Sequence, residues 1–86
     1  MKPNREMERI PLLSNSGVVV SVRGSVVDVR FGGQLPPIYT VLRAGTDRQI
    51  VIEVLALLDA RQVRGSALSP TRGLARGVAV EESAGA

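Results

Sequence analysis

The 86-residue sequence contains no cysteine, no histidine and no tryptophan, and its only lysine is Lys2. Without cysteine, the chain has neither a disulfide framework nor a thiolate metal site. The absence of histidine removes the most common general base and metal ligand from the candidates for catalysis. These absences argue against an autonomous enzyme, and we expect no catalytic and no metal-ligating residue in this chain.

The first residues of the chain lack an apolar run. Residues 1–16 mix basic residues such as Arg5 and Arg9 with the acidic Glu6 and Glu8. This segment therefore has neither the apolar region of a secretory signal nor the length of a membrane span, and its acidic residues argue against a transit peptide. We interpret it as a loose N-terminal extension and expect a cytoplasmic protein that does not insert into a membrane.

Valine and leucine dominate the apolar residues, whereas phenylalanine and tyrosine occur once each. β-Branched side chains pack well on a pleated surface, so this composition favours sheet over helix. Between residues 17 and 31, valines alternate over even positions from Val18 to Val22 and over odd positions from Val27 to Phe31. Gly24 lies at the change of parity, which predicts a strand with a bulge or bent corner at this glycine.

The remaining apolar segments are short and are separated by turn-forming residues. The segment 49–58 begins with β-branched residues, which favours a strand, although Leu55–Leu58 would also suit a helix. Strands are predicted at residues 38–42, 49–58, 62–68 and 78–82, with a loop at 32–37, a hairpin turn at 44–48 and a turn-rich segment at 69–77. The sum is about six short strands, which predicts an all-β fold, a small closed six-stranded β-barrel over residues 17–82.

Four groups of motif residues follow one another along these segments. A Gly-x-Val-x-x-Val-x-Gly-x-Val-Val-Asp-Val pattern runs from Gly17 to Val29 and includes Gly24 and Asp28. The later motifs are Leu35-Pro36-Pro37-Ile38-Tyr39, then Glu53-Val54 and Val63-Arg64, then Gly73-Leu74-x-Arg76-Gly77. In this order and spacing, they resemble the start of the β subunit of F-type ATP synthases, over about residues 16–80. The Pro-Pro-Ile-Tyr loop favours the β subunit over its non-catalytic α relative.

The resemblance implies a six-stranded barrel, followed in the full subunit by a nucleotide-binding domain and a helical domain. In that family α and β chains alternate in a ring, and their barrels form a crown that holds the ring together. The expected partners are therefore ATP synthase α subunits and the rest of the catalytic ring, in a complex on the cytoplasmic side of the inner membrane of a bacterium or archaeon. Residues 83–86 resemble the start of the linker to the nucleotide-binding domain, and we expect the chain to be a fragment.

Two features depart from the common family pattern. Ser69 and Arg72, with an added Pro70, stand where the family usually has acidic residues, and Leu55–Leu58 is more apolar than usual. These departures suggest a divergent branch, such as an alternative ion-translocating lineage of the same enzyme.

Chemistry on ATP would require a Gly-x-x-x-x-Gly-Lys-[Ser/Thr] loop that holds the phosphates. Gly32-Gly33 is the nearest candidate, but no lysine follows it, and we interpret it as a turn. We therefore expect no ATP synthesis, no ATP hydrolysis and no bound cofactor in this chain alone, whereas the full subunit that it resembles would use Mg-ATP or Mg-ADP.

Other polar residues have a catalytic or a structural interpretation. Asp28 and Glu53 are candidates for paired acid–base chemistry, but we favour two separate carboxylates on outer strand faces, each paired with an arginine. Pro36, Pro37 and Tyr39 are candidates for peptide docking, but we favour prolines that stiffen a loop and a tyrosine that caps the barrel end. We expect glycine to be required for an unusual φ angle or a close approach of the backbone at three positions: Gly24, Gly73 and Gly77.

The formal net charge is +3, supplied mainly by arginine. Small barrels bind single-stranded nucleic acid by combining a basic groove with aromatic stacking platforms, so a nucleic-acid-binding module is the alternative function. Phe31 belongs to a valine-rich face and is predicted to lie in the core, which leaves one aromatic residue, Tyr39. We favour contacts between protein subunits for the candidate surface arginines Arg23, Arg30, Arg64, Arg72 and Arg76.

Overall fold

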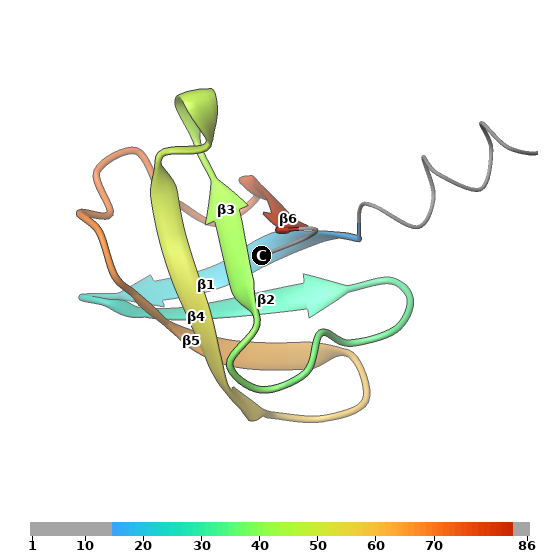
Figure 1. Ribbon diagram of the computed structural model, residues 1–86. Helices are drawn as coiled ribbons and strands as arrows, with labels where there is room; N and C mark the ends of the chain where they lie inside the picture. Colours follow the sequence, from blue (N-terminus) through green and yellow to red (C-terminus); the bar gives the residue numbers. More distant parts are fainter. Residues whose placement is uncertain (1–14, 84–86) are drawn as a thin grey trace, which may run out of the picture.

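The computed structural model describes residues 15–83 and arranges them as a closed barrel (Figure 1). Around the barrel the strands follow the order β1-β2-β5-β4-β3-β6, and every neighbouring pair is antiparallel. The strands are β1 (Ser16–Arg23), β2 (Val26–Phe31), β3 (Val41–Ala44), β4 (Ile50–Leu57), β5 (Gln62–Ala67) and β6 (Ala79–Glu82), with a 3-10 turn at Thr46–Arg48. The predicted all-β fold and closed six-stranded barrel are confirmed.

Neighbouring strands are antiparallel, so successive connections lie at alternate ends of the barrel. At one end β1 begins and β6 ends, and the β2–β3 loop (residues 32–40) and the β4–β5 turn (residues 58–61) lie there too. We call this the terminal end. The opposite end, here called the hairpin end, carries the β1–β2 turn, the β3–β4 turn and the β5–β6 loop (residues 68–78).

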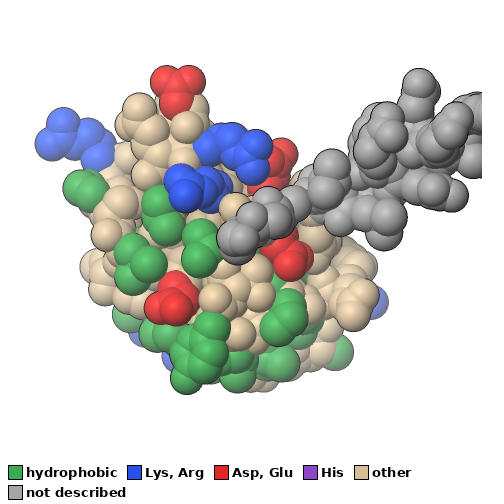
Figure 2. All heavy atoms as spheres, viewed as in Figure 1, with side chains coloured by type: hydrophobic (Ala, Val, Ile, Leu, Met, Phe, Trp, Pro, Cys, Tyr) green, Lys and Arg blue, Asp and Glu red, His purple; other side chains and the backbone are tan. Residues whose placement is uncertain are grey.

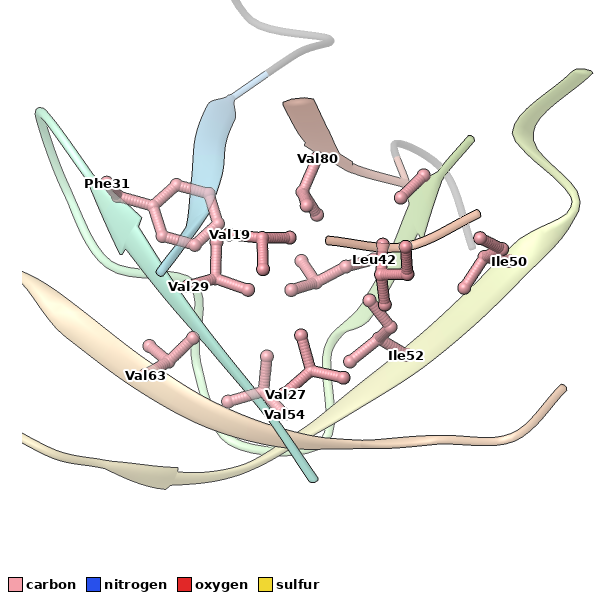
Figure 3. Packing of buried hydrophobic residues seen from close by; sticks show 12 residues of the cluster. Val19, Val27, Val29, Phe31, Leu42, Ile50, Ile52, Val54, Val63 and Val80 are labelled. Atoms are coloured by element: carbon pink, nitrogen blue, oxygen red, sulfur yellow. The ribbon is translucent and has the colours of Figure 1, made fainter. Parts of the chain in front are cut away.

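Hydrophobic side chains fill the inside of the barrel, whereas the outer surface carries both signs of charge (Figure 2). Figure 3 shows side chains from β1, β2 and β6 meeting Leu42 of β3 and Ile52 of β4. Phe31 is fully buried among them, as predicted. The buried cluster comprises Val19, Val27, Val29, Phe31, Leu42, Ala44, Ile50, Ile52, Val54, Val63, Leu74 and Val80.

The prediction of a bent corner at Gly24 is wrong. Arg23 of β1 pairs with Val26 of β2, so Gly24 and Ser25 form a two-residue hairpin turn between two strands. Gly24 has φ 60°, and glycine at the first position of such a turn supplies the positive φ that tight hairpins require. The bulge lies instead inside β1, between Val19 and Ser21.

The predicted strand at residues 38–42 begins too early. Ile38 and Tyr39 form a turn in which the Thr40 N–H donates to the Pro37 carbonyl at 3.1 Å. Tyr39 has φ 74°, and a residue in this left-handed region cannot continue a strand. Regular pairing starts only at Val41.

The other predicted elements lie close to the observed ones. Residues 50–57 form a strand, so the helical interpretation of Leu55–Leu58 is wrong, and a register shift between Val54 and Ala56 marks a second bulge. The first strand starts at Ser16, one residue before the predicted barrel boundary. Apart from residues 15, 16 and 83, the predicted extension (1–16) and linker (83–86) lie outside the described residues.

We expect Phe31→Ala to destabilise the barrel by about 3–5 kcal/mol, because it removes a fully buried ring and leaves a cavity. A domain of this size is stable by roughly 4–13 kcal/mol in total, so much of the stability would be lost. Urea denaturation followed by far-UV circular dichroism measures the change. Val18→Ala, on the half-exposed outer face of β1, is the control and should cost less than about 1 kcal/mol. Equal losses in the two variants would contradict the assigned core.

Candidate functional site

The best-defined polar arrangement joins Asp28 of β2 to Arg64 of β5. These residues are register partners on adjacent strands, and their side chains lie on the outer face of the barrel. Arg64 Nε donates to Asp28 Oδ1 at 2.8 Å, and its terminal nitrogen donates to Oδ2 at 3.0 Å. The Ser21 hydroxyl donates to Oδ2 at 3.4 Å. Arginine thus holds the carboxylate with two parallel hydrogen bonds, which is the strongest geometry available to this pair.

This arrangement keeps Asp28 ionised. The hydrogen bond from Arg64 and the charge of its guanidinium lower the pKa of Asp28 below its usual value, against burial, which raises it. Ser21 and, more weakly, the charge of Arg23 act in the same direction as Arg64. Asp28 itself is almost fully buried. Both oxygens of this carboxylate accept hydrogen bonds, so Asp28 links two strands. A carboxylate held in this way is poorly suited to act as a general acid or base.

Glu53 lies on a different part of the barrel. It is on β4, where its register partners are Val41 of β3 and Ser66 of β5. Within residues 15–83 its carboxylate takes part in neither of the two ion pairs, which join Arg64 to Asp28 and Arg48 to Glu81. Strand β5 separates it from Asp28. The structure therefore does not bring the two candidate carboxylates together, and the predicted arginine partner of Glu53 is absent from this region.

The candidate arginines are distributed over the surface. Arg23 is exposed at the hairpin end of β1, and Arg30 is exposed near the terminal end of β2. Arg64 is engaged with Asp28, while Arg72 and Arg76 are exposed in the β5–β6 loop. Phe31 is in the core and Tyr39 is at the terminal end, so the described residues do not combine a basic groove with stacked aromatic side chains.

The Leu-Pro-Pro-Ile-Tyr segment closes the terminal end of the barrel with its first two residues. Pro36 is fully buried, and Leu35 packs against the core. Pro37 and Ile38 are exposed, and the Tyr39 side chain is 72% exposed. The prediction that Tyr39 caps the barrel is therefore wrong, because most of its side chain is exposed.

The Gly-Leu-x-Arg-Gly segment fixes the long β5–β6 loop to the barrel. Leu74 is buried in the core cluster. Gly73 and Gly77 flank it with φ 87° and 94°, a conformation that side chains other than that of glycine rarely tolerate. The Gly77 N–H donates to the Val19 carbonyl at 2.8 Å. Arg76 is exposed, so in this motif leucine and the glycines shape the fold while the arginine is available for contacts.

The comparisons with known proteins agree with this architecture. Residues 19–83 match the model of the β-barrel domain of the ATP synthase alpha/beta family. The chain belongs to this family. The predicted resemblance is thereby confirmed, and a nucleic-acid-binding module receives no support.

The relatives of this barrel domain are ATP synthase β subunits. Over 71 residues the chain is 62% identical to ATP synthase subunit beta 2 of Albidiferax ferrireducens and 66% identical to subunit beta 1 of Psychromonas ingrahamii, with 83% of this chain and 14% of each relative covered. It is 53% identical over 79 residues to subunit beta 2 of Shewanella frigidimarina, with 92% of this chain and 17% of the relative covered. The chain thus spans less than a fifth of the length of these relatives.

Two further findings concern the described region alone. Among residues 15–83, no helix is long and apolar enough to cross a membrane. In the same region no three side chains of the acidic, histidine or cysteine types lie close enough to hold a metal ion.

Sequence reasoning missed the backbone irregularities at Tyr39 and Leu55. Tyr39 has a positive φ, and Leu55 is the extra residue of the bulge in β4. Tyrosine is not a residue that usually marks a left-handed position, so no local signal reveals the first. The second has no local signal either, because the bulge is defined by the pairing of β4 with β5.

We expect the contribution of Asp28 to stability to depend on pH. The folded-state pKa of Asp28 is lowered, so its contribution is present above the unfolded-state pKa of about 3.9 and is lost as pH falls through the folded-state value. At pH 7 the wild-type barrel should therefore be more stable than Asp28→Asn, and this difference should shrink towards pH 2. Urea unfolding at several pH values measures it. Glu53→Gln is the control, and a similar pH-dependent difference in that variant would contradict a specific role for Asp28.

Proposed function

We propose that this barrel is a structural domain of an ATP synthase β subunit that helps to hold the subunit in a ring of alternating α and β subunits. The observation that carries the proposal is the match of a closed barrel to the β-barrel domain of this family, among relatives named as β subunits. Closure leaves no free strand edge. A partner must therefore bind through side chains, and the barrel keeps its shape while it does so.

The exposed arginines are the candidates for contacts with neighbouring α subunits. Arg23 and Arg30 project from the outer faces of β1 and β2, and Arg72 and Arg76 lie in the adjoining β5–β6 loop. Arginine is well suited to protein interfaces because its planar group binds carboxylates and stacks on other side chains. Arg64 belongs to the same candidate set, but its guanidinium already donates two hydrogen bonds to Asp28.

The rest of the subunit would supply the chemistry on Mg-ATP or Mg-ADP, coupled to ion transport. The barrel itself contributes no cofactor site in this proposal. The complex would lie on the cytoplasmic side of a bacterial membrane and be attached to it peripherally through other subunits. A divergent, alternative ion-translocating branch of the enzyme would accommodate Ser69, Pro70 and Arg72.

The ring contact can be tested with a chimeric subunit in which residues 1–83 of this chain replace the barrel of the Albidiferax ferrireducens relative. Co-expressed with the α subunit of that organism, the chimera should enter a mixed α/β assembly on native mass spectrometry. Arg23→Glu combined with Arg30→Glu should lower the assembled fraction at least tenfold, because both positive charges are reversed. Gln49→Glu, on the exposed β3–β4 turn, is the control. A folded chimera that never associates with α would contradict the proposal.

We further expect the 86-residue chain alone to neither bind nor hydrolyse ATP. Isothermal titration with Mg-ATP should give no heat of binding, and phosphate release should not exceed the rate without protein. Saturable binding or turnover by the purified chain would overturn the assignment of nucleotide chemistry to the rest of the subunit.

A further inference from the structure

Strand β6 completes the barrel on the side opposite to β5, the strand that precedes it in the sequence. In either direction round the barrel, two other strands lie between β6 and β5. The other five strands form one unbroken sheet in the order β1-β2-β5-β4-β3, with β1 and β3 at its edges. β6 fills the gap between these edges and is connected to β5 by the long β5–β6 loop (Figure 1). The fold is therefore a five-stranded sheet with a binding site for one further strand.

Backbone pairing holds β6 on both sides. One side pairs with residues 16–18 of β1, and the other pairs with residues 42–44 of β3. The ladder extends beyond the start of β6, because the Val19 N–H donates to the Val78 carbonyl at 3.0 Å. Main-chain hydrogen bonds of this kind give affinity for any extended segment, whereas the side chains give specificity.

Three side chains of β6 determine which segment fits this gap. Val80 points into the core and is fully buried (Figure 3). Arg48 Nη2 lies 3.1 Å from Glu81 Oε1, and the Asn15 side chain donates to Glu82 Oε1 at 3.2 Å. The gap thus fits an extended segment in which an apolar residue is followed by two carboxylates.

The end of the β5–β6 loop is bound to the sheet together with β6. Leu74 is buried in the core cluster, and Val78 packs against that cluster. The Gly77 N–H donates to the Val19 carbonyl at 2.8 Å. Residues 74–82 are therefore held as one continuous unit, which we call the closing segment.

Residues 70–73, here called the hinge, join the closing segment to the rest of the barrel. Before the hinge the loop is fixed to β4, because the Leu68 N–H donates to the Val51 carbonyl at 2.7 Å. Three of the four hinge residues are exposed. Gly73 has φ 87°, and glycine adopts positive and negative φ about equally readily. A rotation at Gly73 would direct the closing segment away from its own barrel.

We propose that the gap between β1 and β3 is a strand-binding site that accepts the closing segment of a second copy of this chain as well as its own. When two copies exchange these segments, each five-stranded sheet is closed by residues 74–82 of the other copy. Every contact described above forms again, because the two sequences are identical, and only the hinge changes conformation. The inference does not depend on the contacts with α subunits proposed above.

Exchange would depend on protein concentration. A short flexible tether gives the chain's own closing segment an effective concentration in the millimolar range. A second copy competes when its concentration approaches this range, or when chains fold together before the gap is filled. Until then β1 and β3 are free edges, and free edges pair with other chains. A second copy carries the same apolar residue and carboxylates as the native segment, so it is the partner that fits.

Single-cysteine variants can detect the exchange, because the chain contains no cysteine. Val18 of β1 and Ala79 of β6 are exposed register partners. Such partners have Cα atoms about 4.5–5.5 Å apart, within the range of a disulfide. A Val18→Cys chain and an Ala79→Cys chain are unfolded together in urea, refolded at high concentration and oxidised. If β6 of one chain pairs with β1 of the other, a disulfide joins the two chains.

The control mixture combines the same Val18→Cys chain with an Arg30→Cys chain. Val18 and Arg30 are also register partners, on β1 and β2, but neither strand is exchanged. We expect the Val18–Ala79 mixture to give at least fivefold more disulfide-linked heterodimer, identified by mass spectrometry of the unreduced protein. Native mass spectrometry of the wild-type chain should show a dimer whose share rises with the concentration during refolding.

A hinge variant provides a second test. Deletion of residues 70–72 should prevent the closing segment from reaching the gap in its own barrel, so we expect the dimer to predominate. Equal yields from the two cysteine mixtures, in variants whose circular dichroism matches that of the wild type, would overturn the inference. A wild-type dimer whose cysteine variants give no Val18–Ala79 link, or a folded hinge variant that stays monomeric, would also overturn it.

Discussion

Closure of the β-ladder is the constraint on which the rest of the structure depends. Strands β3 and β6 contain only four residues each, and strands this short do not persist unless both edges are paired. β6 fills the gap between β1 and β3. The strands must also approach closely: a Cβ on Gly17 would lie 2.7 Å from the Arg30 carbonyl oxygen, and one on Gly65 would lie 2.7 Å from the Glu53 carbonyl oxygen. Glycine at these two points allows the neighbouring strands to approach this closely.

The residues of the family motifs mainly stabilise the barrel. Pro36 is buried at one end and Leu74 is anchored in the core beneath the β5–β6 loop. Asp28 joins β2 to β5 through Arg64. Asp28, which is a candidate for acid–base chemistry in the sequence, therefore has a structural role here. This is why strong motif matches predict the architecture and the family but assign no catalytic group to the barrel.

The sequence predicts the elements whose character is set locally. Alternating valines and β-branched residues mark β2, β4 and β5, and Phe31 follows the alternation into the core. Gly24 was misplaced because a change of parity looks the same whether the chain bends or reverses direction. The positive φ of Tyr39 and the bulge at Leu55 depend on hydrogen bonds between segments distant in sequence. The solvent exposure of Tyr39 and Leu55 therefore could not be foreseen from either segment alone.

A closed barrel has no free strand edge, so a contact surface on it is defined by its side chains. The lateral surface offers exposed arginines such as Arg23 and Arg30, whose attraction to carboxylates is screened over about 10 Å at moderate ionic strength. The terminal surface offers leucine, isoleucine and tyrosine, whose burial salt does not screen. Contacts made through the arginines would then weaken as the ionic strength rises, whereas contacts made through the apolar side chains would not.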